Sequence, residues 1–134
     1  MAIQLSVVRH FIACEDVVSD GKSITLRNLV QAIVPSPGEK YPLIAERMAL
    51  YAVLTNGRGK RSFALEMTRF ERGEEASIKR MPAREVDVGQ DPTAFRGLPF
   101  PLKVVFAKPG HYTFHLLCEG VAIAEETILL KEER

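Results

Sequence analysis

Most of the chain consists of short apolar runs separated by turn-forming residues. In residues 23–30, for example, Ile24 and Leu26 alternate with Thr25 and Arg27. An alternation with a period of two places apolar side chains on one face of a β-strand and polar side chains on the other. No stretch keeps a helical period over the length of a helix, so the pattern predicts a protein built from strands.

The runs predict about eight strands joined mainly by tight turns. Asp20-Gly21 is a typical hairpin signal, and we expect a type I′ turn there, because this turn needs positive φ at both central residues. The predicted strands are residues 3–13, 23–30, 47–55, 61–70, 76–81, 102–107, 111–118 and 121–130, with a short edge segment at 85–88.

Two longer segments, residues 31–46 and 89–101, are rich in proline. Proline cannot donate to a central ladder, so we expect both segments to be irregular connections that cross between sheets. Short strands with two such crossings favour a two-sheet antiparallel β-sandwich, immunoglobulin-like or Greek-key, over a closed barrel. Residues 1–134 contain no linker or repeat and are predicted to form a single β-sandwich domain. The sequence leaves open which strands share a sheet.

Composition and charge argue against nucleic acid and membranes as partners. The 134 residues include 18 basic and 17 acidic side chains, a net charge of +1, which provides no general attraction to nucleic acid or to an anionic membrane. The basic segment 57–61 lacks the interleaved aromatic residues of a nucleic-acid surface. Arg9 and His10 interrupt the first apolar run, so it does not resemble a signal peptide. We therefore predict a cytoplasmic protein with no nucleic-acid or membrane partner.

The C-terminal segment 109–125, with Pro109-Gly110 before one strand and Glu119-Gly120 before the next, resembles the closing hairpin of immunoglobulin-like sandwiches. The chain as a whole resembles a family of short, uncharacterised bacterial β-sandwich proteins. The matching positions are Ala13-Cys14-Glu15, Asp20-Gly21-Lys22 and Asn28-Leu29, followed by a proline-containing loop. The resemblance implies the fold but no activity, so no catalytic or binding residue is transferred.

Five potential metal ligands lie near the two ends of the chain: His10, Cys14, His111, His115 and Cys118. Zinc needs three or four ligand atoms within about 2.0–2.3 Å of one point. On a strand, residues four apart such as the two C-terminal histidines share a face but lie about 13 Å apart. We therefore predict no metal site and no cofactor, and we interpret the cysteines as small buried hydrophobes.

Cys14 or Cys118 with His115 is the best Cys–His candidate, although these residues belong to predicted strands. A Cys14–Cys118 disulfide needs the first and penultimate strands to pack together, and the reducing cytosol disfavours it. The sequence contains no GxSxG elbow, and we predict no catalytic residue from motifs alone.

Spaced acids in two loops, Asp16 with Asp20 and Asp87 with Asp91, lack the alternate spacing of a calcium loop. Asp20 and Asp91 are instead typical of turns.

Several strands carry consecutive large apolar residues, as in Val7-Val8, Phe11-Ile12, 98–100 and Leu129-Leu130. The two inner faces of one sandwich cannot bury both members of such pairs, so either some strands lie between packed surfaces or an outer patch is covered by another subunit. We therefore predict a homodimer through an apolar sheet face or edge, and an unidentified protein partner as a further candidate. The predicted function is a non-enzymatic binding or protein-interaction domain. The alternative is a small enzyme whose site at a subunit interface uses Cys14, His111 or His115.

Overall fold

The computed structural model describes residues 6–71 and 73–133, and its regular elements are all β-strands. This confirms the predicted all-β class, with ten strands in place of about eight. In chain order the strands are β1 Val7–Ser19, β2 Ile24–Leu29, β3 Ala32–Ile33, β4 Leu43–Thr55, β5 Lys60–Glu71, β6 Glu74–Arg80, β7 Arg84–Asp87, β8 Arg96–Phe106, β9 Gly110–Cys118 and β10 Val121–Leu130.

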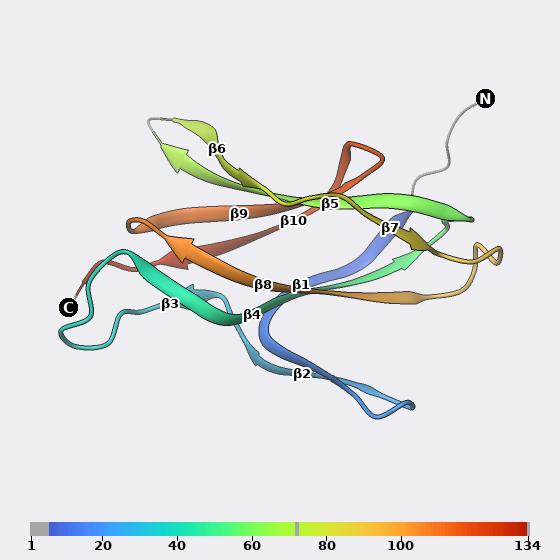
Figure 1. Ribbon diagram of the computed structural model, residues 1–134, viewed down its shortest axis with the longest axis horizontal. Helices are drawn as coiled ribbons and strands as arrows, with labels where there is room; N and C mark the ends of the chain where they lie inside the picture. The colour runs from blue at the N-terminus through green and yellow to red at the C-terminus, as the bar shows by residue number, and fades with distance from the viewer. Residues whose placement is uncertain (1–5, 72, 134) are drawn as a thin grey trace.

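The strands form two sheets that face each other as layers (Figure 1). Sheet A has four strands in the order β2-β1-β4-β8. Sheet B has six strands: β3-β10-β9-β5-β6 in order, with β7 also pairing with β5. Neighbouring strands run antiparallel except for the short β3, which is parallel to β10.

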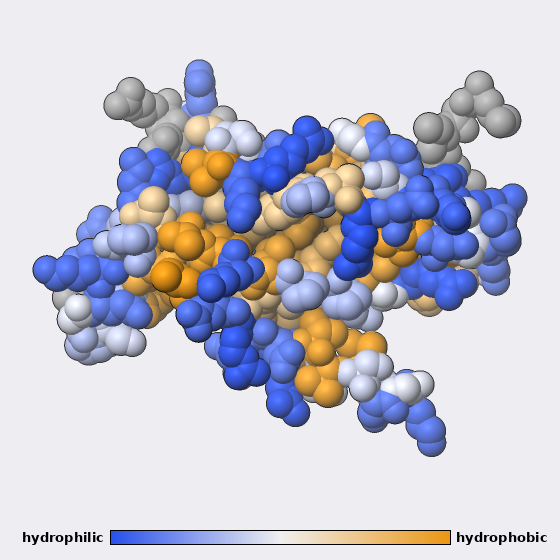
Figure 2. Space-filling model, in the orientation of Figure 1, coloured by the Kyte–Doolittle hydropathy of each residue, from blue (hydrophilic) through white to orange (hydrophobic). Residues whose placement is uncertain are grey.

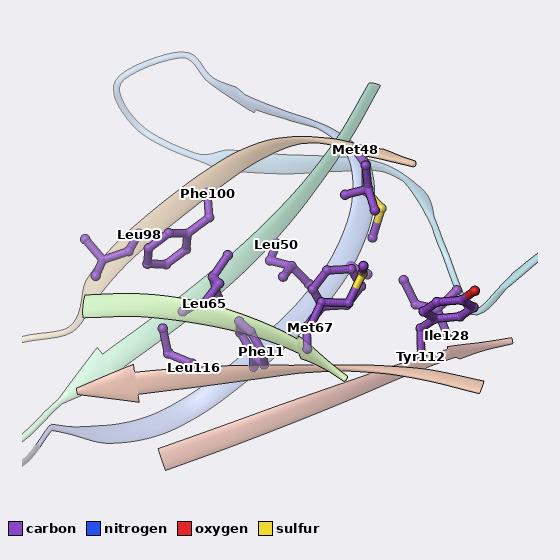
Figure 3. Packing of buried hydrophobic residues seen from close by; sticks show 14 of the residues in the cluster. Phe11, Met48, Leu50, Leu65, Met67, Leu98, Phe100, Tyr112, Leu116 and Ile128 are labelled. Carbon is purple, nitrogen blue, oxygen red and sulfur yellow. The ribbon is translucent and has the colours of Figure 1, made fainter. Parts of the chain in front are cut away.

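The core lies between the layers because alternate residues of each strand turn inward. Phe11 of β1, Leu50 of β4 and Phe100 of β8 reach it from sheet A, and Leu65 of β5 and Leu116 of β9 reach it from sheet B. Figure 3 shows these side chains packed together between the strands. Burying side chains of this size contributes about 1.5–3 kcal/mol each, which makes this contact between the sheets the main source of stability.

The first proline-rich segment does cross between the sheets. It leaves β2 in sheet A, adds β3 to sheet B and returns to sheet A as β4. The sequence did not predict the short strand β3. It predicted that β4 would begin at residue 47, whereas β4 begins at Leu43.

The second proline-rich segment was predicted to be irregular throughout, and this is wrong for residues 96–101. β8 begins at Arg96 and contains Pro99 and Pro101. It is an edge strand that pairs only with β4 among the described strands. The Pro99 carbonyl accepts a hydrogen bond from the Arg84 guanidinium of β7, Nη2 to O 3.3 Å, so it points away from β4. Residue 101, two positions along the strand, directs its backbone groups to the same side. The two prolines therefore lack N–H groups only on the free edge, and the hydrogen bonds to β4 are kept.

The hairpin of β1 and β2 is present at the predicted place, but its turn differs from the predicted type I′. Asp20 N–H donates to the Ser23 carbonyl at 3.2 Å, so the central residues are Gly21 and Lys22. Of these two, only Gly21 has positive φ, at +89°, which is the pattern of a type II′ turn. Figure 1 shows the tip of this hairpin projecting away from the two layers.

Candidate functional site

The outer face of sheet A carries apolar side chains on its three longest strands, interrupted by His10 of β1 and Lys103 of β8. Pairing aligns Ile12, Tyr51 and Pro99 in one row and Cys14, Ala49 and Pro101 in the next. We call the following set the apolar face: Ile12, Ile44, Ala49, Tyr51, Val53, Pro99, Pro101 and Val105.

Consecutive apolar residues in the sequence divide between the core and the apolar face. Phe11 is buried while Ile12 faces outward, and Phe100 is buried beside the outward Pro99. Ile44 and Val105 lie directly opposite each other and expose 56% and 52% of their surface. Within one chain, these pairs therefore place one apolar side chain in the core and the other outside it.

Tyr51 is buried on the apolar face because it lies over a glycine. A Cβ atom built on Gly97 would meet the Tyr51 hydroxyl at 2.0 Å and its Cζ at 2.8 Å. Only a residue without a side chain lets the ring settle against the β8 backbone here. The centre of the apolar face is therefore tightly packed, although no other element covers it in the part of the chain that the structure describes.

A bulge in β4 between Ala45 and Met48 opens a groove at one end of this face. The groove has a volume of about 380 Å³, and Asp16, Arg47, Met48 and Pro101 are among its lining residues. The Arg47 guanidinium lies 3.6 Å from the Asp16 carboxylate across it. The groove therefore has an apolar floor and a charged rim.

The outer face of sheet B carries two polar rows, next to an apolar row of Ala64, Leu117 and Ala122. The first row aligns Thr68 of β5, Thr113 of β9 and Thr127 of β10. The second aligns Glu66, His115 and Glu125 on the same three strands.

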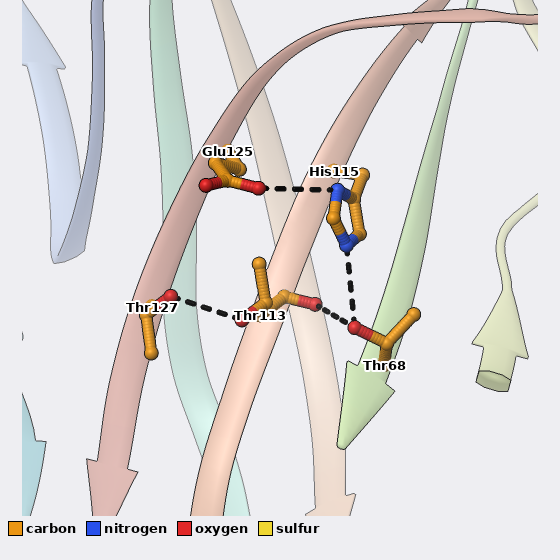
Figure 4. A network of polar contacts seen from close by, with 5 residues as sticks. All are labelled: Thr68, Thr113, His115, Glu125 and Thr127. Atoms are coloured by element: carbon orange, nitrogen blue, oxygen red, sulfur yellow. Dashed lines mark hydrogen bonds and ion pairs between the residues drawn. The ribbon is translucent and has the colours of Figure 1, made fainter. Parts of the chain in front are cut away.

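Hydrogen bonds tie the polar rows together, as Figure 4 shows. His115 Nε2 lies 3.2 Å from Thr68 Oγ1, and its Nδ1 lies 3.7 Å from Glu125 Oε2. The Thr68 hydroxyl donates to the Thr113 carbonyl at 3.5 Å, and the hydroxyls of Thr113 and Thr127 lie 2.9 Å apart. With the Thr68 proton on the Thr113 carbonyl, His115 Nε2 is the donor to Thr68.

Hydroxyl, imidazole and carboxylate follow one another here in the order used by nucleophilic hydrolases. The geometry does not favour that chemistry. Thr68 is only 5% exposed, and its proton is directed to a backbone carbonyl rather than to the imidazole. The network instead holds the His115 ring between Thr68 and Glu125.

The structure separates the residues of the enzymatic alternative. Cys14 lies in sheet A with no exposed surface, whereas His111 and His115 lie on the outer side of β9 in sheet B. Cys118 also lies on β9 but points into the core. Both cysteines are free thiols, and burial raises the pKa of each. Within one chain these side chains do not form a common site.

The acids assigned to turns do form turns. The Asp20 carboxylate accepts hydrogen bonds from the Ser23 and Lys22 N–H groups at 2.8 Å, which lower its pKa. The Asp91 carboxylate accepts from the Thr93 hydroxyl at 2.7 Å and the Thr93 N–H at 2.9 Å, and its pKa is lowered in the same way. Both carboxylates therefore stabilise loops.

Among the described residues, no three His, Cys, Asp or Glu side chains are arranged to hold a metal ion. The same residues include no helix with the length and hydropathy to cross a membrane. Comparison with protein-family models found no match, and no curated protein matches the chain. The fold defines the class as an all-β protein of two facing sheets.

Proposed function

We propose that this chain is a non-enzymatic interaction domain that binds a second copy of itself through sheet A. The observation that carries the proposal is the set of large apolar side chains that sheet A leaves exposed, Ile24 and Leu29 on its β2 edge and Ile44 and Val105 on its outer face. Contiguous apolar surface on a monomer typically marks an interface. The near-neutral charge of +1 presents no electrostatic barrier to self-association.

We further propose that the two sheets form an immunoglobulin-like sandwich. If β4, β5, β8, β9 and β10 correspond to strands B, C, E, F and G, then sheet B reproduces the G-F-C order, with β6 as C′. In sheet A, β1 takes the place of strand A beside B and E. The described strands include no counterpart of strand D, and β2 extends the sheet beyond strand A instead.

A tyrosine at the start of β9 supports the same interpretation. The Tyr112 hydroxyl donates to the Lys108 carbonyl at 2.5 Å, four residues upstream, at the corner between β8 and β9. Immunoglobulin-like domains carry a tyrosine with this bond at the start of strand F. Its ring also packs edge-on against Phe106, with centroids 4.9 Å apart. The fold alone assigns no activity.

We also propose that the chain belongs to a bacterial family, that it is cytoplasmic, and that it binds an additional protein partner. The enzymatic alternative differs in needing convergent polar groups in a concave site. The polar rows of sheet B lie on a sheet surface, and the Thr68 hydroxyl is buried, which favours the interaction domain.

Sedimentation velocity over a concentration range of about 1–500 µM tests the proposed function. We expect a reversible monomer–dimer equilibrium, because several exposed side chains at about 1.5–3 kcal/mol each are enough for micromolar affinity. A strict monomer at the highest concentration would contradict the proposal.

A further inference from the structure

The two free edges of sheet A differ in whether they can accept another strand. On β8, proline removes the N–H groups of residues 99 and 101 from the free edge, and Arg84 occupies the Pro99 carbonyl. The Arg84 guanidinium also lies 4.8 Å from the centre of the Phe100 ring, which holds it against this edge. Natural sheets block their edges with such devices against further pairing.

The edge of β2 carries none of these devices. Its sequence contains no proline, and no described strand pairs with its outer side. Five of its six residues are exposed, and Ile24 exposes 46% of its surface. Figure 2 shows hydrophobic colour over this strand, in contrast to the hydrophilic hairpin tip. An exposed edge of this kind is a template for another strand.

The turn determines which backbone groups are free. Because Asp20 and Ser23 form the hydrogen-bonded pair that closes the hairpin, the next hydrogen-bonded pairs are Val18–Thr25 and Asp16–Arg27. Thr25 and Arg27 therefore direct their N–H and C=O groups to β1. Ile24 and Leu26 direct theirs to the free edge.

Two copies of β2 can satisfy these groups in an antiparallel pair centred on Thr25. In that register, Ile24 of each copy is opposite Leu26 of the other, and each such pair exchanges two backbone hydrogen bonds. Thr25 is opposite Thr25 of the second copy, in a non-hydrogen-bonded pair on the two-fold axis.

Side chains agree with this register. Ile24 and Leu26 lie on the same side of β2, so they meet across the interface as apolar pairs. The only charge on the strand, Arg27, is opposite Ser23 of the second copy, so no like charges face each other. Asn28, with φ of +54°, ends the regular edge, and its side chain donates to Glu15 of β1 at 3.0 Å. A register centred on Leu26 would place Ile24 opposite this irregular residue.

We infer that the chain dimerises by antiparallel pairing of β2 with β2 of a second copy, in the register centred on Thr25, which joins the two copies of sheet A into one continuous sheet. This inference rests on the proposed self-association and specifies the contact. The apolar face of each copy then lies in one continuous surface rather than inside the interface.

Disulfide trapping tests the register. Facing residues of a non-hydrogen-bonded pair have Cα atoms about 4.5 Å apart, within the range that a disulfide can span. We expect Thr25→Cys to form a covalent dimer under mild oxidation, seen on a non-reducing gel, and Ser23→Cys to stay monomeric because it faces Arg27 rather than itself. The native cysteines are buried and serve as an internal background. Efficient trapping at Leu26→Cys with none at Thr25→Cys would overturn the register.

Two further variants separate the edge from the apolar face. Leu26→Pro removes only an outward N–H group, so the hairpin remains folded while two inter-subunit hydrogen bonds disappear. We expect its dimer Kd to rise about 30-fold, with an unchanged circular dichroism spectrum and melting temperature of the monomer. Ile44→Lys, the control on the apolar face, should leave the Kd within about twofold.

The two proposals fail in different ways. A dimer that Ile44→Lys dissociates and Leu26→Pro does not would overturn the β2 contact while keeping self-association through sheet A. A wild-type chain that never dimerises would overturn both.

Discussion

The outer faces of sheet A and sheet B are produced by the same alternation of side chains, yet they expose different chemistry. On sheet A the outward positions of β4 and β8 hold Tyr51, Val53 and Pro99 in aligned rows. On sheet B the outward positions of β5 and β9 hold Thr68 and His115. Both sheets bury their inward residues equally well, so the difference is not required by the fold.

The comparison shows two ways in which outward side chains of a sheet are held in place: by hydrogen bonds and by packing. On sheet B, side chains of the two polar rows hydrogen-bond to one another. On sheet A, Tyr51 packs against Gly97, but its apolar neighbours remain in contact with water. A hydrogen-bonded polar network and a tightly packed aromatic ring therefore lie on opposite sides of one small domain, and substitutions can test each separately.

The largest effect should come from filling the space that Tyr51 uses on sheet A. Gly97→Ala places a Cβ atom 2.0 Å from the tyrosine hydroxyl, so the ring must leave its position over β8. Overpacking of this kind lowers the free energy of unfolding by about 1–3 kcal/mol, measurable by urea denaturation. In a Tyr51→Leu background the same substitution should cost much less. Additive losses would show that the contact does not hold the ring.

An intermediate effect is expected on sheet B. Thr68→Val keeps the shape of the side chain but removes the hydroxyl that contacts His115 and the Thr113 carbonyl. We expect a loss of about 1 kcal/mol in the free energy of unfolding, because the His115 Nε2 loses a buried partner. Thr127→Val, at the exposed end of the same row, is the control and should cost less than half as much. Equal losses would mean that the network adds nothing to the sheet.

The sequence predicted the inward and outward positions better than the partners across strands. The alternation at Phe11-Ile12 or around Pro99 was enough to divide apolar side chains between core and surface. The polar rows could not be found in this way, because Thr68 and Thr113 lie 45 residues apart and meet only through the pairing of β5 with β9. The alternation of apolar and polar residues indicates which face of a sheet a side chain lies on. It does not indicate which strand pairs with which.

The proline-rich segment before residue 102 shows a second limit of the sequence. Pro99 and Pro101 argued against a strand, and that argument holds for a central strand only. Whether a strand lies at the edge depends on the pairing of the whole sheet. The candidate contact at β2 depends on the same global property, although the Asp20-Gly21 signal placed its hairpin correctly.

The smallest effect is expected from two adjacent glutamates of β10, which face opposite sides of sheet B. Burial raises the pKa of Glu126 above its usual value, whereas the side chain of Glu125 lies on the polar face and is 69% exposed. Below the unfolded-state pKa, Glu126 is protonated in both states and carries no penalty. As the pH rises through the raised folded-state pKa, the native state must bury a charge and loses stability.

Glu126→Gln should therefore increase the melting temperature at pH 7 and have no effect near pH 3, whereas Glu125→Gln should change it little at either pH. Thermal melts of the two variants across this range measure the difference. If Glu125→Gln reproduced the gain of Glu126→Gln, the stabilisation would come from net charge, and the inner and outer positions of β10 would not be electrostatically distinct.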